Sequence, residues 1–219
     1  MQLPLPVIAL LVVGGIIATP DFQCWNFGST NEIRDRYLKE VNRLRSELAK
    51  GNVEGQGGKC PAGKNIYRLV WDCILENEAQ KVVNKCDEKA KAPGGDVAMV
   101  IKKVPLNTCN PNPLFKTTVE KWWSAVKNAK VDPNTAPTSS SELQDFATLA
   151  HGDATRIGCA QKNCKGNLFM ACMVYNKGPA EGQPIYEVGP GCSNPQDCTT
   201  YEGSRCNKDQ KLCVAGYID

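Results

Sequence analysis

Residues 155–175, TRIGCAQKNCKGNLFMACMVY, contain two apolar runs that predict a β-hairpin. The first run spans Thr155 to Gln161 and the second spans Leu168 to Tyr175, with the six residues KNCKGN as the loop between them. Upstream of this hairpin, apolar residues recur at helical intervals instead. Helices first and a sheet last, joined by hairpins, favour an α+β layered domain over a doubly wound one.

Two long helices are predicted in the first part of the chain. Ser29 and Glu32 have capping-box spacing, and the apolar residues that follow recur every three or four positions until Gly51. The stretch 67–85 carries a broader apolar face. We therefore expect an amphipathic first helix and a well-buried second helix.

Two further helices precede the hairpin. Asn112 is the expected cap of the third helix, with Pro113 at the favoured first position. Ser139 and Glu142 repeat the capping-box spacing, and this short fourth helix is expected to end at Gly152. The remaining apolar clusters predict two short strands, 97–101 and 184–188.

The N-terminal residues and the cysteines indicate export. Residues 1–18 lack charged side chains and end in an apolar run too short to span a bilayer, which predicts a signal peptide. The mature chain is then a folded domain, 19–190, followed by a cysteine-rich extension, 191–219. An even number of cysteines in an exported chain implies six disulfides. The twelve cysteines are Cys24, Cys60, Cys73, Cys86, Cys109, Cys159, Cys164, Cys172, Cys192, Cys198, Cys206 and Cys213.

Composition excludes several classes of function. The net charge is +3 on 26 basic and 23 acidic residues, and no run of Lys and Arg alternates with aromatic residues, which argues against nucleic acid as a partner. No C-x-x-C pair and no Cys/His pair at finger spacing occurs, which argues against a zinc ribbon or finger. Nothing after the leader is apolar enough to predict a membrane anchor.

Five short motifs resemble those of a known family. They are VNRLRS at 41–46, LVWDCILE at 69–76, WWS at 122–124, IGC at 157–159 and CMVY at 172–175. In this order and spacing they resemble the CAP superfamily of cysteine-rich secretory, antigen-5 and pathogenesis-related proteins, and within it the secreted proteins of parasitic nematodes. The resemblance implies a three-layer α-β-α sandwich with a disulfide-held C-terminal extension.

Three other stretches narrow the resemblance. DFATLA at 145–150, GQPIYEVG at 182–189 and LCVAG at 212–216 are similar to the branch that contains the hookworm platelet inhibitor and neutrophil inhibitory factor. Members of that branch are regarded as antagonists of host integrins. The resemblance therefore implies a secreted parasite effector that binds a host cell-surface protein and antagonises integrin-dependent platelet or leukocyte adhesion.

The family cleft that holds zinc in many relatives is expected to be degenerate in this chain. That cleft uses two histidines and two glutamates, whereas this chain has one histidine in total. The resemblance places Asp96, Ala125 and Asp145 at three of the cleft positions, and no histidine lies in 87–94, where the remaining ligand is expected. We expect no cofactor, no bound metal and no catalytic residues, and hence no enzyme.

One tripeptide is the candidate receptor-binding motif. His151-Gly152-Asp153 has the form of the basic-Gly-Asp sequence with which disintegrins engage integrins through a receptor-bound metal ion. The competing interpretation is structural: Gly152 ends the fourth helix and Asp153 starts the turn into the hairpin. Because histidine is shorter than arginine and mostly neutral at pH 7, the structural interpretation is favoured.

Two other functions compete with receptor binding. Some relatives in the family carry sterols or fatty acids, so a lipid-binding CAP carrier protein is the alternative, and an apolar groove would favour it. A degenerate hydrolase is the least favoured function, because the cleft ligands are missing. The sequence leaves the receptor, the disulfide connectivity and the oligomeric state open.

Overall fold

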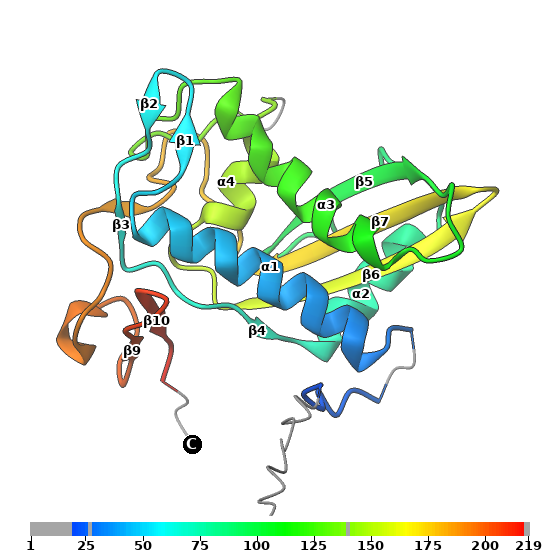
Figure 1. Ribbon diagram of the computed structural model, residues 1–219, viewed down its shortest axis with the longest axis horizontal. Helices are drawn as coiled ribbons and strands as arrows, with labels where there is room; N and C mark the ends of the chain where they lie inside the picture. The colour runs from blue at the N-terminus through cyan, green and yellow to red at the C-terminus, as the bar shows by residue number, and fades with distance from the viewer. Residues whose placement is uncertain (1–18, 26–27, 139–140, 217–219) are drawn as a thin grey trace, which may run out of the picture.

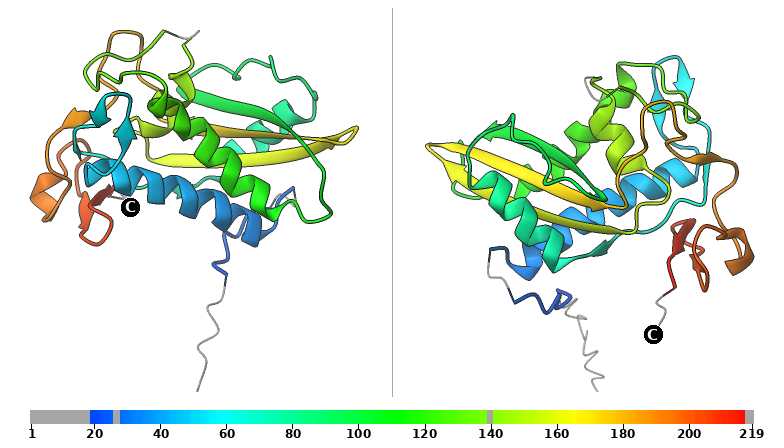
Figure 2. Two further views of the ribbon diagram at one scale, coloured as in Figure 1. Left: turned by 45° about the horizontal axis from the view of Figure 1, so that its top comes forward. Right: turned by 180° about the vertical axis from the view of Figure 1, so that it is seen from behind.

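The protein is a three-layer α-β-α sandwich, as predicted. A computed structural model describes residues 19–25, 28–138 and 141–216. Three helices cover one face of a four-stranded sheet and the fourth covers the other face (Figure 1; Figure 2, right). The helices are α1 (Asn31–Ala49), α2 (Cys73–Val83), α3 (Asn112–Ser124) and α4 (Gln144–Ala150), with a 3-10 turn η1 (Ala125–Lys127) after α3.

The hairpin predicted at 155–175 forms the centre of the sheet. The strands run in the order β4-β6-β7-β5, with β4 parallel to β6 and the other pairs antiparallel. The hairpin loop is only Lys165-Gly166, both at positive φ, because the ladder continues to Cys164 and Asn167; the expected six-residue loop was too long. The strands are β4 (Val70–Trp71), β5 (Val97–Pro105), β6 (Arg156–Cys164) and β7 (Asn167–Tyr175).

Successive side chains along each strand point to opposite faces of the sheet, so two separate cores form. The face covered by α2 buries Ala160, Phe169, Ala171 and Met173. The face covered by α1, α3 and α4 buries the intervening residues of the same strands. Gly158 makes the close approach of α2 possible, because a Cβ there would lie 2.1 Å from the Glu76 nitrogen. The glycine of the IGC motif is therefore required by packing.

Two predicted helix starts need correction. The cap of α1 is Thr30, whose hydroxyl accepts from the Ile33 nitrogen, whereas the Ser29 hydroxyl accepts from the Gln161 side chain. Helix α2 starts at Cys73 and not at residue 67, because Asp72 caps it and the preceding residues form β4.

The other two helices differ from prediction at their ends. Helix α3 starts at Asn112 itself, one residue earlier than expected, with Pro113 in its first turn. Helix α4 starts after Leu143, which makes no side-chain cap, and ends at Ala150. The predicted cap Ser139 lies outside the described residues.

Three pairs of short strands among the described residues lie outside the four-stranded sheet. The strand predicted at 184–188 forms only at its last two residues, which pair with a strand in the loop after α1. The strand at 97–101 is longer than expected and reaches Pro105. The short elements are β1 (Glu54–Gly55), β2 (Gly58–Lys59), β3 (Gly63–Lys64), β8 (Glu187–Val188), β9 (Arg205–Asn207), β10 (Leu212–Val214) and a 3-10 turn η2 (Pro195–Asp197).

The expectation of six disulfides is wrong: there are five, and Cys60 and Cys109 are free thiols. Cys60 lies beside Val126, past the end of α3, and Cys109 precedes the start of that helix. Thirteen helical residues span about 20 Å, far more than the roughly 7 Å that a bridge allows between Cα atoms. The bridges are Cys24–Cys73, Cys86–Cys164, Cys159–Cys172, Cys192–Cys206 and Cys198–Cys213.

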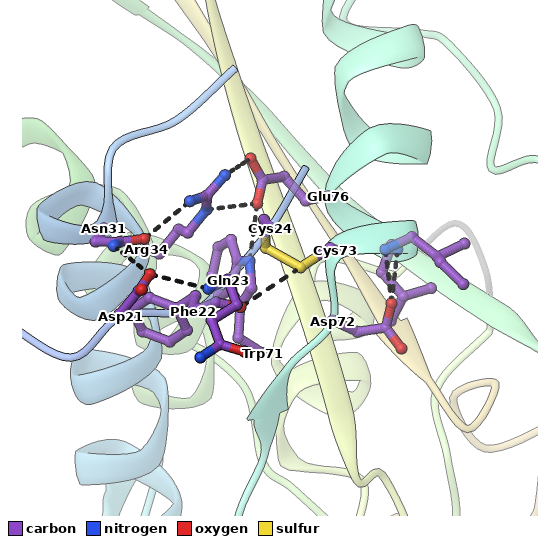
Figure 3. The surroundings of a disulfide bond; sticks show 12 residues. Asp21, Phe22, Gln23, Cys24, Asn31, Arg34, Trp71, Asp72, Cys73 and Glu76 are labelled. Carbon is purple, nitrogen blue, oxygen red and sulfur yellow. Dashed lines mark hydrogen bonds and ion pairs between the residues drawn. A yellow bond between two sulfur atoms is a disulfide. The ribbon is translucent and has the colours of Figure 1, made fainter. Parts of the chain in front are cut away.

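The first disulfide lies beside a buried ion pair (Figure 3). Arg34 of α1 donates from Nε and Nη2 to Glu76 of α2 at 2.7 and 3.0 Å, and both side chains are almost fully buried. Trp71 of β4 donates its Nε1 to the same carboxylate at 2.8 Å. Cys24–Cys73 fixes the N-terminal segment over this pair, so three elements and the segment meet at one point.

Disulfides replace a core in the C-terminal extension. Its buried cluster consists of Cys192, Cys198 and Cys213 packed on Tyr67 of the sandwich. The boundary at 190/191 and the signal peptide stay predictions, the latter because 1–18 lies outside the described residues. None of the helices in the described part of the chain is long and apolar enough to cross a membrane.

Candidate functional site

Three polar residues of the VNRLRS motif fix α1 to segments that are distant in the sequence. Asn42 binds the main chain of Leu69 twice, donating from Nδ2 to the carbonyl at 2.9 Å and accepting from the amide at 2.8 Å. The Ser46 hydroxyl donates to the Gln210 carbonyl of the extension at 2.7 Å. The motif therefore acts through side chains that bind main-chain groups. Such contacts can fix a loop whatever side chains the loop carries.

Arg45 lies at the centre of this set and is completely buried. Its guanidinium donates only to carbonyl oxygens: Tyr67 at 2.8 Å, Leu149 at 2.6 Å, Gly152 at 3.1 Å and Ala154 at 3.3 Å. Burial lowers the pKa of Arg45 to about 9, and the negative charge of Asp153 opposes this shift. The side chain therefore stays charged at neutral pH and holds the segment that follows α4.

That segment is His151-Gly152-Asp153, and most of its main-chain polar groups are hydrogen-bonded. The Gly152 amide donates to the Ile185 carbonyl at 2.9 Å, and its carbonyl accepts from the Tyr67 amide at 3.0 Å as well as from Arg45. The Asp153 carbonyl accepts from the Tyr201 hydroxyl at 2.6 Å. The tripeptide is a junction between α4, the hairpin and the extension, and it does not project as a loop.

His151 is half-buried at the C-terminal end of α4. Its Nδ1 lies 3.1 Å from the Ile185 carbonyl, so that nitrogen carries the proton when the two are hydrogen-bonded. Burial lowers the pKa of His151, and this effect outweighs the carbonyl contact and the charge of Asp153, which act in the opposite direction. A neutral imidazole cannot imitate the cation of a basic-Gly-Asp motif.

The tripeptide lines a groove of about 470 Å³. Residues 184–188 and Thr200 of the extension also line it, and the Thr200 hydroxyl lies 3.5 Å from the Asp153 carboxylate. The rim carries Val188, which is 46% exposed, and Glu187, whose pKa is lowered chiefly by its hydrogen bond to Lys64 and also by Asn65. The groove therefore combines an apolar rim residue with two carboxylates, those of Asp153 and Glu187.

The three residues at the predicted cleft positions lie on or beside α3, α4 and β5, and we call them the degenerate cleft. Ala125 follows α3, Asp145 is in the first turn of α4, and Asp96 is exposed just before β5. No hydrogen bond or ion pair joins these three residues within the described chain. Burial raises the pKa of Asp145 to about 6, and the positive charge of Lys102 reduces this shift.

These residues do not suit the metal that the family cleft implies. Asp145 stands at one histidine position, residues 87–94 supply no histidine for the other, and Ala125 has a methyl group in place of a glutamate, so the nitrogen ligands that zinc prefers are missing. The sole histidine, His151, is bound to Ile185. Among the described residues, the one group of three potential ligands with donor atoms within 4.8 Å is Cys192, Cys198 and Cys213, all in disulfides and so without a thiolate.

The family model of the cysteine-rich secretory protein family, CAP, matches residues 30–175. The chain belongs to this family. The CAP domain contains all four helices and the four-stranded sheet, and the extension follows it.

Hookworm relatives support the nematode branch of the CAP family. Ancylostoma secreted protein from Ancylostoma caninum is 31% identical over 91% of this chain and 46% of its own length, and hookworm platelet inhibitor 1 from the same species is 27% identical over 83% and 86%. The crystal structure of Na-ASP-1 superposes with a TM-score of 0.83 at 30% identity, covering 91% of this chain and 49% of that one. The chain thus spans about half the length of the first of these relatives and of Na-ASP-1.

The site residue that sequence reasoning missed is Arg45. The motif containing it was recognised, but the motif gives no indication that its arginine binds carbonyls 104 to 109 residues away. The spacing of the apolar residues could have indicated that Arg45 is buried, because Val41, Leu44 and Leu48 place it on the buried side of α1. A charged residue on such a face requires several hydrogen-bond acceptors.

Proposed function

We propose that this CAP protein is a secreted, non-enzymatic effector that binds a host cell-surface protein through the groove over His151-Gly152-Asp153. The observation that carries the proposal is the ordered main chain of this groove, fixed by Arg45, Tyr67 and Tyr201. A rigid surface binds without an ordering cost, which favours recognition of a folded partner. The five disulfides and the secreted relatives support the extracellular setting.

An integrin is the receptor class that we propose. Support comes from the hookworm platelet inhibitor, which is 27% identical over most of both chains. The tripeptide is not expected to act as a disintegrin loop, because the Gly152 main chain is engaged inside the protein and burial favours neutral His151. Contacts from the rim, chiefly Val188 and Glu187, would carry recognition instead.

Surface plasmon resonance against immobilised platelet and leukocyte integrins tests this proposal. We expect Val188→Asp to weaken binding by about 30-fold or more, as for a hot-spot residue. Asp153→Ala should change binding by less than about threefold, because the Asp153 carboxylate is next to the Thr200 hydroxyl and the substitution leaves the main chain of the tripeptide in place. Ile74→Asp is the matched control, since Ile74 is also an exposed aliphatic residue, at 62%, on another face.

Three results would contradict the proposal. Equal loss with Val188→Asp and Ile74→Asp would show that the groove is not the binding surface. Loss of more than about 2 kcal/mol with Asp153→Ala would restore the tripeptide as the hot spot. Failure of the wild-type protein to bind any integrin would remove the receptor class.

A lipid or fatty-acid carrier is the second candidate function, and one groove favours it. A space of about 520 Å³ lies between the N-terminal segment, α1 and β4, with Phe22, Leu38, Val70 and Trp71 among its lining residues. Arg68 also lines it and forms no ion pair within the described chain, so a carboxylate headgroup would find a partner there. Native mass spectrometry with oleate, comparing wild type with Leu38→Glu, tests this function, and equal binding by both would refute the site.

A further inference from the structure

The end of the sheet opposite the extension carries concentrated positive charge. Six lysines from four segments lie there: Lys85, Lys89, Lys102, Lys103, Lys162 and Lys165, which we call the basic end. The Cys86–Cys164 disulfide joins the segment after α2 to the end of β6, with 6.0 Å between Cα atoms. In Figure 1 the β6–β7 turn, which holds Lys165, is the tip that projects from this end of the sheet.

The register places two of these lysines on one face. Lys103 of β5 and Lys162 of β6 both pair with Phe169 of β7, so they flank that residue across three strands. Strands are about 4.8 Å apart, which separates the two lysine Cα atoms by about 10 Å. The Lys103 Nζ lies 5.9 Å from the Phe169 ring centroid, which keeps the ammonium group over the sheet.

Few acidic groups offset this charge. Asp87 and Glu88 lie in the same segment, and Glu88 accepts from the Lys103 amide at 3.2 Å and approaches Lys102 Nζ at 3.9 Å. Within the described chain, none of the other five lysines lies within ion-pair distance of a carboxylate. The positive charge of Lys102 also acts on Asp145, so six lysines stand against three acids, and the difference of +3 equals the net charge of the entire chain. The remainder of the protein is therefore close to neutral, and the basic end is a local feature.

We propose that the basic end binds a sulfated polysaccharide of the glycosaminoglycan class. Exposed ammonium groups on a rigid hairpin suit a flexible polyanion whose sulfates can each approach one lysine. A single-stranded nucleic acid would gain from an aromatic stacking surface, whereas Phe169 is only 5% exposed. This surface is separate from the groove of the proposed function.

An anionic membrane is the competing partner, and the position of apolar side chains argues against it. Peripheral membrane binding needs apolar or aromatic residues beside the basic ones. The exposed large apolar residues of the described chain are Trp25, Ile74, Tyr175 and Val188. Tyr175 lies at the opposite end of β7, Trp25 and Ile74 adjoin the Cys24–Cys73 bridge, and Val188 lies in β8. None of them belongs to the basic end.

Heparin affinity of the full chain tests the proposal. The variant replaces three exposed lysines, Lys103→Gln, Lys162→Gln and Lys165→Gln, and its matched control replaces three exposed lysines elsewhere, Lys59→Gln, Lys130→Gln and Lys208→Gln. We expect the first variant to lose at least about tenfold in affinity and to lower the log–log salt slope by about 2, at roughly 0.7 per lost phosphate-like contact. The control should lose less than about threefold, through net charge alone.

Further probes distinguish the outcomes. Fully desulfated heparin should fail to bind at 0.15 M salt, roughly the physiological ionic strength. Equal losses in the two triple variants, or no binding by wild type at that salt, would overturn the proposal. Binding to phosphatidylserine vesicles that exceeds binding to heparin, and is lost with the first variant, would replace the polysaccharide by a membrane. Circular dichroism checks that both variants retain the native fold.

Discussion

The α1 contacts and the degenerate cleft belong to the same sandwich, but among the described residues buried polar groups are hydrogen-bonded in the first and not in the second. At α1, Arg45 and Asn42 are buried and their donors meet main-chain acceptors. At the cleft, Asp145 is partly buried without a hydrogen-bonding partner in the described chain, and Ala125 offers no polar atom. The polar residues of α1 organise the fold, whereas the predicted cleft positions lack the histidines that the family zinc site uses.

The largest expected effect comes from removing the central arginine. Arg45→Met preserves side-chain length but leaves four carbonyl oxygens without this donor, so we expect a loss of about 3–4 kcal/mol in the free energy of unfolding. Urea denaturation measures it, and Arg36→Met, which removes an exposed i,i+4 ion pair, should cost less than about 1 kcal/mol. If Arg45→Met fails to fold, Arg45→Lys should show an intermediate loss. Equal stability of Arg45→Lys and wild type would contradict the role of the guanidinium.

A smaller loss is expected at Asn42. Asn42→Ala removes both hydrogen bonds to Leu69 and leaves a buried amide and carbonyl unpaired, at a cost of about 2 kcal/mol. Asn52→Ala is the matched control, because that side chain is exposed and contacts only Glu47. Thermal unfolding compares the two variants. A similar small shift in both would mean that water replaces the Asn42 contacts.

A substitution at the degenerate cleft should raise the free energy of unfolding, whereas those at Arg45 and Asn42 lower it. Because burial raises the pKa of Asp145 to about 6, the folded state holds its proton more tightly than the unfolded state does. This group therefore lowers stability as pH rises from about 4 through 6, and has no such effect below the unfolded pKa. Asp145→Asn should gain about 1–2 kcal/mol at pH 7.5 and almost nothing at pH 3.5. Denaturation at both pH values, with exposed Asp96→Asn as control, measures this; a loss at pH 7.5 would show that the carboxylate has a stabilising partner.

The smallest expected effect on stability comes from the two free thiols, one of which is buried and the other exposed. Cys60 is 6% exposed and burial raises its pKa, whereas Cys109 is exposed. Titration with a thiol reagent should show one fast group in the native protein and a second only after denaturation. Cys109→Ser should remove the fast group without changing stability. No reactive thiol in the native and denatured protein would restore the sixth disulfide.

The sequence by itself determined the number of helices, the central hairpin and the class of the fold. These features are local, because a helix or strand can be predicted from the period of its apolar residues; the sequence placed the hairpin but made its loop six residues long, whereas the turn is Lys165-Gly166. The sequence also predicted the loss of the zinc ligands, because a chain with one histidine cannot supply two.

Only the tertiary structure decided which cysteines pair, that Cys60 and Cys109 do not, and that His151-Gly152-Asp153 is a junction. It also decided that residues 187–188 pair with residues 63–64 and that five basic-end lysines approach no carboxylate within the described chain. These facts depend on contacts between positions far apart in the chain, such as Arg45 with Gly152, separated by 107 residues. No local pattern records such a contact, because the acceptor is a main-chain carbonyl that every residue possesses.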